Sequence, residues 1–234
     1  PGKYEAIWYM KEENGRWTPP QIAPFSAEYN GNFPAFSPDG RRLFFTSGRP
    51  RGGAAGAGGA DIWFVDKTAD GWGEPVNMGV LDGLEDTDAE HASASRDGTV
   101  YFHLVRRTGS GLEADIWSSS PSGDGYSTPR RLPAGVNTGF VEAGPFVAPD
   151  GSYLIFASNG GRGANGGFEI MVSFRGGDGG WNPAVSLSTI IGPGMRQCAG
   201  ISADGRYVFF IGATDDNWDY YWVDSAVIDG LRDR

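Results

Sequence analysis

The sequence is poor in several features, and each shortage excludes a class of protein or site. It has one cysteine, Cys198, which rules out an intrachain disulfide and a zinc site built from cysteines alone. Its 19 basic residues are outnumbered by 29 acidic ones, and this balance is the wrong sign for a nucleic-acid-binding surface. No apolar run reaches the ~18 residues of a membrane helix, so we expect no membrane insertion.

Glycine and aromatic residues are abundant, with 38 Gly, 14 Phe, 8 Trp and 9 Tyr in 234 residues. That aromatic content is enough for a folded core. Four Asp-Gly pairs recur about every 54 residues, each between two short β-rich runs, and this pattern predicts tight turns within β-hairpins. The pairs are Asp39-Gly40, Asp97-Gly98, Asp150-Gly151 and Asp204-Gly205.

A second marker follows each hairpin and predicts a third strand, as at Asp61-Ile62-Trp63 and Asp115-Ile116-Trp117. A glycine-bearing turn and an aromatic residue come next, and we place the opening of a fourth strand at that aromatic residue. The recurring tryptophans of these strands are predicted to pack between neighbouring repeats. They are Trp8, Trp17, Trp63, Trp72, Trp117, Trp181 and Trp222.

Four strands per repeat are typical of a propeller blade, so the sequence predicts an all-β fold, a β-propeller of four-stranded antiparallel blades. We expect one domain over residues 1–234, with blades at 1–28, 29–80, 81–136, 137–191 and 192–224 and a short helix at 225–232. The first blade lacks two strands and the last lacks one. We therefore expect a five-bladed ring with about 40 residues upstream of Pro1. The alternative is a four-bladed ring whose termini share one blade.

The stretch from Phe33 to Ser47, followed by Asp61-Ile62-Trp63, resembles the TolB-like β-propeller repeat of bacterial envelope proteins. The likeness recurs along nearly the whole chain. It implies a propeller that is periplasmic or secreted. Propellers of this type serve as protein-binding domains, as lids on peptidases and as scaffolds of polysaccharide lyases, so the resemblance favours no single activity.

Candidate ligand-binding residues gather on one predicted face of the ring. In a blade the first strand lines the central channel, and the loops between blades share a face with the loops that join second and third strands. Arginines opposite carboxylates at a channel mouth can bind a polar ligand, although surface loops are often simply polar. The candidates are Asn32, Arg49, Arg162, Arg196, Gln197 and Trp218.

Only two histidines are present. His91 starts a channel-lining strand, and if the protein is an enzyme we expect His91 as general base with Glu90 or Glu142 as acid. His103 takes the position that Phe45, Phe156 and Phe210 hold in other repeats, so we interpret it as a packed histidine. We expect no clustered histidine metal site, which counts against metal-using oligogalacturonate lyases with a similar repeat.

An acidic stretch from Asp82 to Glu90 offers hard oxygen ligands. Asp86, Asp88 and Glu90 are candidate ligands for Ca²⁺, although the spacing is not that of an EF-hand and a solvated loop is the favoured interpretation. No other cofactor is expected, because the sequence has no phosphate-binding loop and no nucleophile elbow.

These observations lead to two hypotheses. The first is a non-enzymatic binding or scaffold propeller of the bacterial envelope, monomeric, which binds a protein partner or a polar glycan-like ligand at the channel mouth. The alternative is a lyase or hydrolase acting on an acidic carbohydrate.

Overall fold

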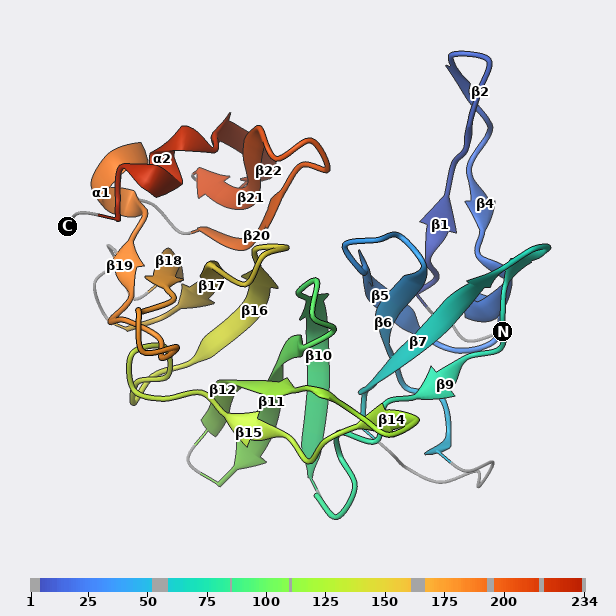
Figure 1. Cartoon of the computed structure of the whole chain (residues 1–234), viewed down its shortest axis with the longest axis horizontal. Helices are drawn as coiled ribbons and strands as arrows, with labels where there is room; N and C mark the ends of the chain where they lie inside the picture. Colours follow the sequence, from blue (N-terminus) through green and yellow to red (C-terminus); the bar gives the residue numbers. More distant parts are fainter. Residues whose placement is uncertain are drawn as a thin grey trace.

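The computed structural model describes residues 5–51, 59–84, 86–109, 111–160, 167–192, 196–214 and 217–232. Antiparallel sheets follow one another around a common centre in the order of the sequence (Figure 1). The chain is thus an all-β propeller, as the sequence predicts.

Each stretch predicted as a blade contains one principal sheet. The first sheet pairs β1 (Trp8–Tyr9) with β4 (Gln21–Ile22). The second contains β5 (Gly31–Phe36), β6 (Arg42–Ser47), β7 (Asp61–Thr68), β8 (Gly71–Trp72) and β9 (Val76–Asn77). The third contains β10 (Thr87–Ala94), β11 (Val100–Thr108), β12 (Gly111–Ser119) and β15 (Arg130–Arg131). The fourth contains β16 (Glu142–Val147), β17 (Tyr153–Ser158), β18 (Glu169–Phe174) and β19 (Val185–Ser186). The last contains β20 (Arg196–Ile201), β21 (Tyr207–Thr214) and β22 (Asn217–Asp224).

The Asp-Gly pairs form the predicted hairpin turns. In the second sheet, the Ser37 hydroxyl donates to Asp39 Oδ1 over 2.6 Å and accepts the Arg42 N–H at 2.9 Å. Gly40 closes this turn with φ of 67°, a left-handed conformation that glycine adopts without strain. Each turn connects the first strand of a sheet to the second, which brings residues before and after it into register.

The predicted start of the fourth strands is wrong by four residues. Trp17 and Tyr126 instead lie in small hairpins, β2 (Glu12–Glu13) with β3 (Arg16–Trp17) and β13 (Pro121–Ser122) with β14 (Gly125–Tyr126). The fourth strands β4, β9, β15 and β19 begin four residues after the aromatic positions and are only two residues long. Strands that short have no alternation from which a sequence could locate them.

The hydrophobic core lies between neighbouring sheets. One cluster joins the second and third sheets and includes Phe44, Phe64 and Phe102. Another joins the third and fourth sheets around Ile116 and Phe156. Two further clusters join the first sheet to the second and the fourth sheet to the last. Each sheet is therefore stabilised by the blade beside it, as radial repetition requires.

The tryptophan prediction holds in the middle of the chain and fails at its ends. Trp63 and Trp181 are buried, and Trp117 packs partly buried against the core. Trp8, Trp17 and Trp222 are instead 59%, 66% and 62% exposed. Trp8 and Trp222 belong to the first and last sheets, which no core cluster joins to each other among the described residues.

The ring is not closed by the strands that the structure describes. The sheet of β20, β21 and β22 ends at β22, the first sheet has two strands, and no described strand pairs one of these sheets with the other. Four sheets have three or more strands, which keeps the four-bladed alternative consistent as well. The number of blades in a closed ring, and any upstream segment, stay predictions.

Helices are short and few in the described ranges. They are the 3₁₀ helix η1 (Pro24–Ser26), α1 (Ser188–Ile191) and α2 (Ala226–Asp229). The first two were not predicted, and the third lies within the predicted helix at 225–232, where Ile228 and Leu231 are buried. None of the described helices has the length and apolarity to span a membrane.

Candidate functional site

The first strands of four sheets bulge at the same repeat position. Pairing with the second strand shifts immediately after Asn32 in β5, Glu90 in β10, Ala143 in β16 and Gln197 in β20. The residue that follows has positive φ at Phe33 (50°), His91 (55°) and Gly144 (60°). Such angles are uncommon outside glycine, and a β-bulge re-aims the side chain that carries it. The bulges thus set which side chains face the neighbouring first strands.

A hollow of about 350 Å³ lies where these first strands meet. Most of its lining is apolar, with contributions from every sheet but the first. Lining residues include Phe33, His91, Phe146, Ile211 and Tyr220. Tyr220, from β22, is 81% exposed, so one wall of the hollow is an accessible aromatic ring.

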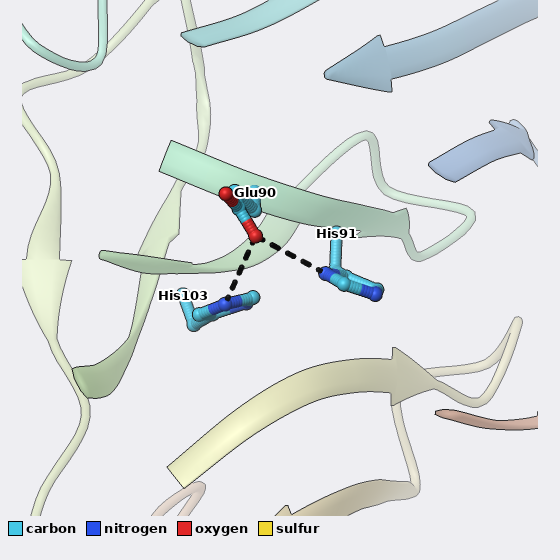
Figure 2. Close-up of side chains that lie close together, drawn as sticks. All are labelled: Glu90, His91 and His103. Atoms are coloured by element: carbon cyan, nitrogen blue, oxygen red, sulfur yellow. Dashed lines mark ion pairs between the residues drawn. The ribbon is translucent and has the colours of Figure 1, made fainter. Parts of the chain in front are cut away.

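Beside this hollow, three side chains of the third sheet converge (Figure 2). Glu90 and His91 come from β10, and His103 comes from β11, where it pairs with Glu90 across the hairpin. Glu90 Oε2 lies 4.0 Å from His91 Nδ1 and 3.8 Å from His103 Nε2. One ligand atom from each residue lies within 4.8 Å of the other two.

The His91 ring is held between neighbours from two adjacent blades. It stacks on Phe33 of β5, with ring centroids 3.4 Å apart and an interplanar angle of 25°. Gly144 of β16 also lies close to the ring, since a Cβ built on this glycine would be 3.9 Å from His91 Cδ2. The His103 centroid is 5.1 Å from that of His91, and the Gly144 N–H donates to His103 Nδ1 at 3.3 Å.

Burial sets the protonation states of these groups. It lowers the pKa of His91 to about 4, and burial with the adjacent His91 ring lowers the pKa of His103 to about 3. Both imidazoles are therefore neutral at pH 7. Burial also raises the pKa of Glu90, and the nearby Asp88 carboxylate raises it further, while Arg107 opposes the shift.

The expectation that the histidines cannot cluster is wrong. The two rings are neighbours, and with Glu90 they form a set of two imidazoles and one carboxylate. The sequence contained a signal for this proximity, because His91 and His103 lie at nearly equal distances from the Asp97-Gly98 turn. Ser93 pairs with Tyr101, and an unbroken register would place His91 opposite His103. The bulge moves Glu90 into that place. The interpretation of His103 as a packed histidine is confirmed, since it is 4% exposed.

Glu142, the other candidate acid, is in a different environment. It is fully buried, and its carboxylate accepts hydrogen bonds from the Thr138 N–H, the Thr138 hydroxyl and the Ser158 hydroxyl at 3.0, 2.6 and 2.9 Å. These contacts tie the loop before β16 to the end of β17. Glu142 therefore stabilises the fourth blade and lies apart from the cluster of Glu90, His91 and His103.

The arginine candidates contact the protein itself. Arg49 donates to the Phe25 carbonyl at 2.5 Å and to the Ser47 hydroxyl at 3.2 Å, and its guanidinium lies 5.1 Å from the Trp63 ring centroid. Arg196 donates to the Gly192 carbonyl at 2.5 Å. Arg162 lies outside the described residues. Neither described guanidinium lines the hollow.

The remaining binding candidates are dispersed. The Asn32 amide donates to Glu5 Oε2 at 2.9 Å, and Gln197 lies half-buried in β20 opposite Ile211. Trp218 is 50% exposed on β22. The sequence analysis did not single out Phe33, Phe146 and Tyr220, which line the hollow.

The calcium candidates do not converge in the described part of the chain. Asp88 is buried, and its carboxylate accepts from the Ala60 N–H at 2.7 Å and from Arg107 Nη1 at 2.5 Å. Asp86 is exposed and joins no group of close ligand atoms. Of the three, only Glu90 belongs to such a group, and its partners there are imidazoles.

No family model and no curated protein matches this sequence. Solved structures match its fold. A TolB candidate from Agrobacterium tumefaciens has a TM-score of 0.61 and 17% identity over 93% of this chain and 70% of that one. Hydrazine synthase from Kuenenia stuttgartiensis has a TM-score of 0.60 and 15% identity over 88% of this chain and 32% of that one. An endo-arabinase from Bacteroides thetaiotaomicron has a TM-score of 0.52 and 11% identity over 94% and 85%.

Fold and site together define a β-propeller whose bulged first strands surround an apolar hollow. Its fold is that of a TolB-like propeller. At such identities the likeness concerns the fold alone, and the function must be argued from the residues of this chain.

Proposed function

We propose that the protein is a non-enzymatic binding propeller that holds an apolar segment of a protein partner in the hollow lined by Phe33, Phe146 and Tyr220. The observation that carries this proposal is the hollow itself, because concave and mostly apolar surfaces with exposed aromatic rings are typical of binding sites. An extended peptide would present side chains of matching character.

A protein segment suits the lining better than a polar glycan does. The arginines expected to hold acidic groups, Arg49 and Arg196, donate to backbone carbonyls of this chain instead. The net charge of −10 also favours a partner that is neutral or basic. We place the protein in the periplasm or outside the cell, as its TolB-like repeat implies, and expect it to act as a monomer.

The enzymatic alternative, a lyase or hydrolase of acidic carbohydrate, has less support. A general base works best with a pKa near the working pH, and burial lowers the pKa of His91 to about 4. Glu142 is fully buried and engaged by Thr138 and Ser158. The endo-arabinase and the puromycin hydrolase among the structural matches share the fold at 11% and 16% identity and contribute no site residue.

Selection from a peptide library displayed on phage tests the proposal. Peptides recovered on the immobilised protein would be measured again with Tyr220→Ala, which removes an exposed ring of the hollow. We expect at least tenfold weaker binding, because exposed aromatic anchors dominate such interfaces. The matched control is Trp17→Ala, which removes another exposed aromatic ring, in the β2–β3 hairpin away from the hollow, and should change nothing.

Two results would refute the proposal. One is selected peptides that bind Tyr220→Ala as well as the original protein. The other is a glycan array, run in parallel, on which acidic oligosaccharides bind and are cleaved while no peptide is selected.

A further inference from the structure

We propose that Glu90, His91 and His103 form a binding site for a divalent transition-metal ion of the Zn²⁺ type at the edge of the hollow. This proposal does not depend on the binding of a protein partner. Imidazole nitrogens and a carboxylate oxygen are the ligands that Zn²⁺ takes in proteins, and sites with three protein ligands keep a position open for a further ligand.

Position in the repeat is the first argument. The chain has two histidines in 234 residues, and both lie in one hairpin, side by side. At the place of His103 the other blades have Phe45, Phe156 and Phe210, and at the place of Glu90 they have Asn32, Ala143 and Gln197. A blade of this fold therefore forms without a histidine at the place of His103 and without a carboxylate at the place of Glu90. Burying the His103 imidazole costs free energy that the phenylalanine of the other blades would not cost, which points to a role beyond the fold.

Geometry is the second argument. In a tetrahedral zinc site with bonds of 2.0–2.1 Å, ligand atoms lie about 3.4 Å apart. Here the carboxylate oxygen lies 4.0 and 3.8 Å from the two imidazole nitrogens. Shifts of under about 1 Å per side chain would bring all three within bonding distance of one ion. The dashed lines of Figure 2 meet at the Glu90 oxygen, with both rings turned toward it.

The charges around the cluster permit a cation. Glu90 carries the charge of the site, and the buried Asp88 carboxylate lies on the same strand. Arg107 is the one cation that acts on Glu90 among the described residues, and its guanidinium is paired with Asp88 Oδ2 at 2.5 Å. Glu5, from the first sheet, adds further negative charge.

Metal binding would change the hydrogen bonding of His103, whose ring contacts the Glu90 backbone as well as the Gly144 N–H. His103 Nδ1 accepts the Gly144 N–H, so in the metal-free protein the proton of this neutral ring is on Nε2. A metal on Nε2 displaces that proton, the ring is then protonated at Nδ1, and the bond from Gly144 must open. This exchange of tautomers gives the site a signature that a merely structural histidine would not have.

The test uses the full chain without a histidine tag, stripped with a chelator and titrated with Zn²⁺ alone by calorimetry. We expect one ion per chain. Glu90→Gln, His91→Phe and His103→Phe should each weaken binding at least tenfold. Phenylalanine is the residue of the other blades at the place of His103, and Phe33 is the counterpart of His91 in the second blade. The matched control, Glu113→Gln, removes an exposed carboxylate on β12 and should leave the affinity unchanged.

A second readout needs no variant. Long-range ¹H–¹⁵N spectra of this chain contain only two imidazoles, and Zn²⁺ should convert His103 from the Nε2–H to the Nδ1–H tautomer. The proposal is wrong if Zn²⁺ leaves both rings unchanged, or if binding survives in His91→Phe combined with His103→Phe. Binding that all the variants retain would mean adventitious surface sites.

Discussion

Two hairpins of the propeller, β10–β11 and β16–β17, share a backbone plan and differ in content. Both have a bulge in the first strand, a turn at an Asp-Gly pair and a second strand buried between blades. At three matched positions, β10–β11 has Glu90, His91 and His103, whereas β16–β17 has Ala143, Gly144 and Phe156. A hairpin of this fold therefore forms with Ala, Gly and Phe at these positions. Glu90, His91 and His103 of the third blade are not needed to form the hairpin.

The largest effect is expected from the apolar hairpin. Phe156→Ala should lower the free energy of unfolding by about 3 to 5 kcal/mol, because Phe156 is 1% exposed and truncation leaves a cavity between the third and fourth blades. Chemical denaturation measures this. A loss below about 1 kcal/mol would show that the interblade core is not the main source of stability.

The next largest difference is expected between Glu142 and Glu90, whose replacement by alanine should lower the free energy of unfolding by different amounts. Glu142→Ala should cost about 1 to 3 kcal/mol, because it leaves the buried Ser158 hydroxyl and the partly buried Thr138 donors without their acceptor. Glu90→Ala removes a partly exposed group whose carboxylate accepts no hydrogen bond from the residues that the structure describes, and it should cost less than about 1 kcal/mol. Equal losses in denaturation would remove the distinction between a structural and a functional carboxylate.

Making the third blade resemble the fourth should be tolerated. His103→Phe leaves the buried Gly144 N–H without its acceptor, which costs about 1 to 3 kcal/mol, and gains apolar burial that offsets part of this cost, so we expect a loss below about 2 kcal/mol. Thermal unfolding of the metal-free protein is the measurement. If His103→Phe unfolds at far lower temperature, the histidine is required by the fold, and the comparison between the hairpins fails.

The smallest effect concerns the two turns. The Ser95 hydroxyl donates to Asp97 Oδ1 at 2.7 Å and lowers the pKa of Asp97. In the other turn Ala148 takes the position of Ser95, and hydrogen bonds from Ser152 lower the pKa of Asp150. A lowered carboxylate pKa contributes stability above the unfolded value of 3.8 that is lost as pH falls through the folded pKa. Ser95→Ala should raise the pKa of Asp97 and leave that of Asp150 in place, as carboxyl NMR titration would show.

Much of the fold could be predicted from the sequence, because Asp-Gly turns and β-rich runs are local signals. The positions of the first, second and third strands follow from them. Burial of tryptophans could not be predicted in the same way, since it depends on a neighbouring blade. Trp63 has one on each side, whereas Trp222 lies at the edge formed by β22.

The sequence analysis named Glu90 and His91 but did not group His103 with them. His91 and Glu90 were recognised as channel-lining residues, but His103 was separated from them because its position is apolar in every other repeat. Its role depends on a bulge that shifts the register by one residue and places Glu90, not His91, opposite His103. Register changes of this kind have no signature in the pattern of residue types.

The most direct test of the account is anomalous X-ray diffraction at the zinc absorption edge, from crystals of the metal-stripped protein grown with one equivalent of Zn²⁺. The account predicts one strong peak between Glu90, His91 and His103, with the ion facing the hollow. No peak there, or peaks only at exposed carboxylates, would contradict it and return the three residues to a structural role in the third blade.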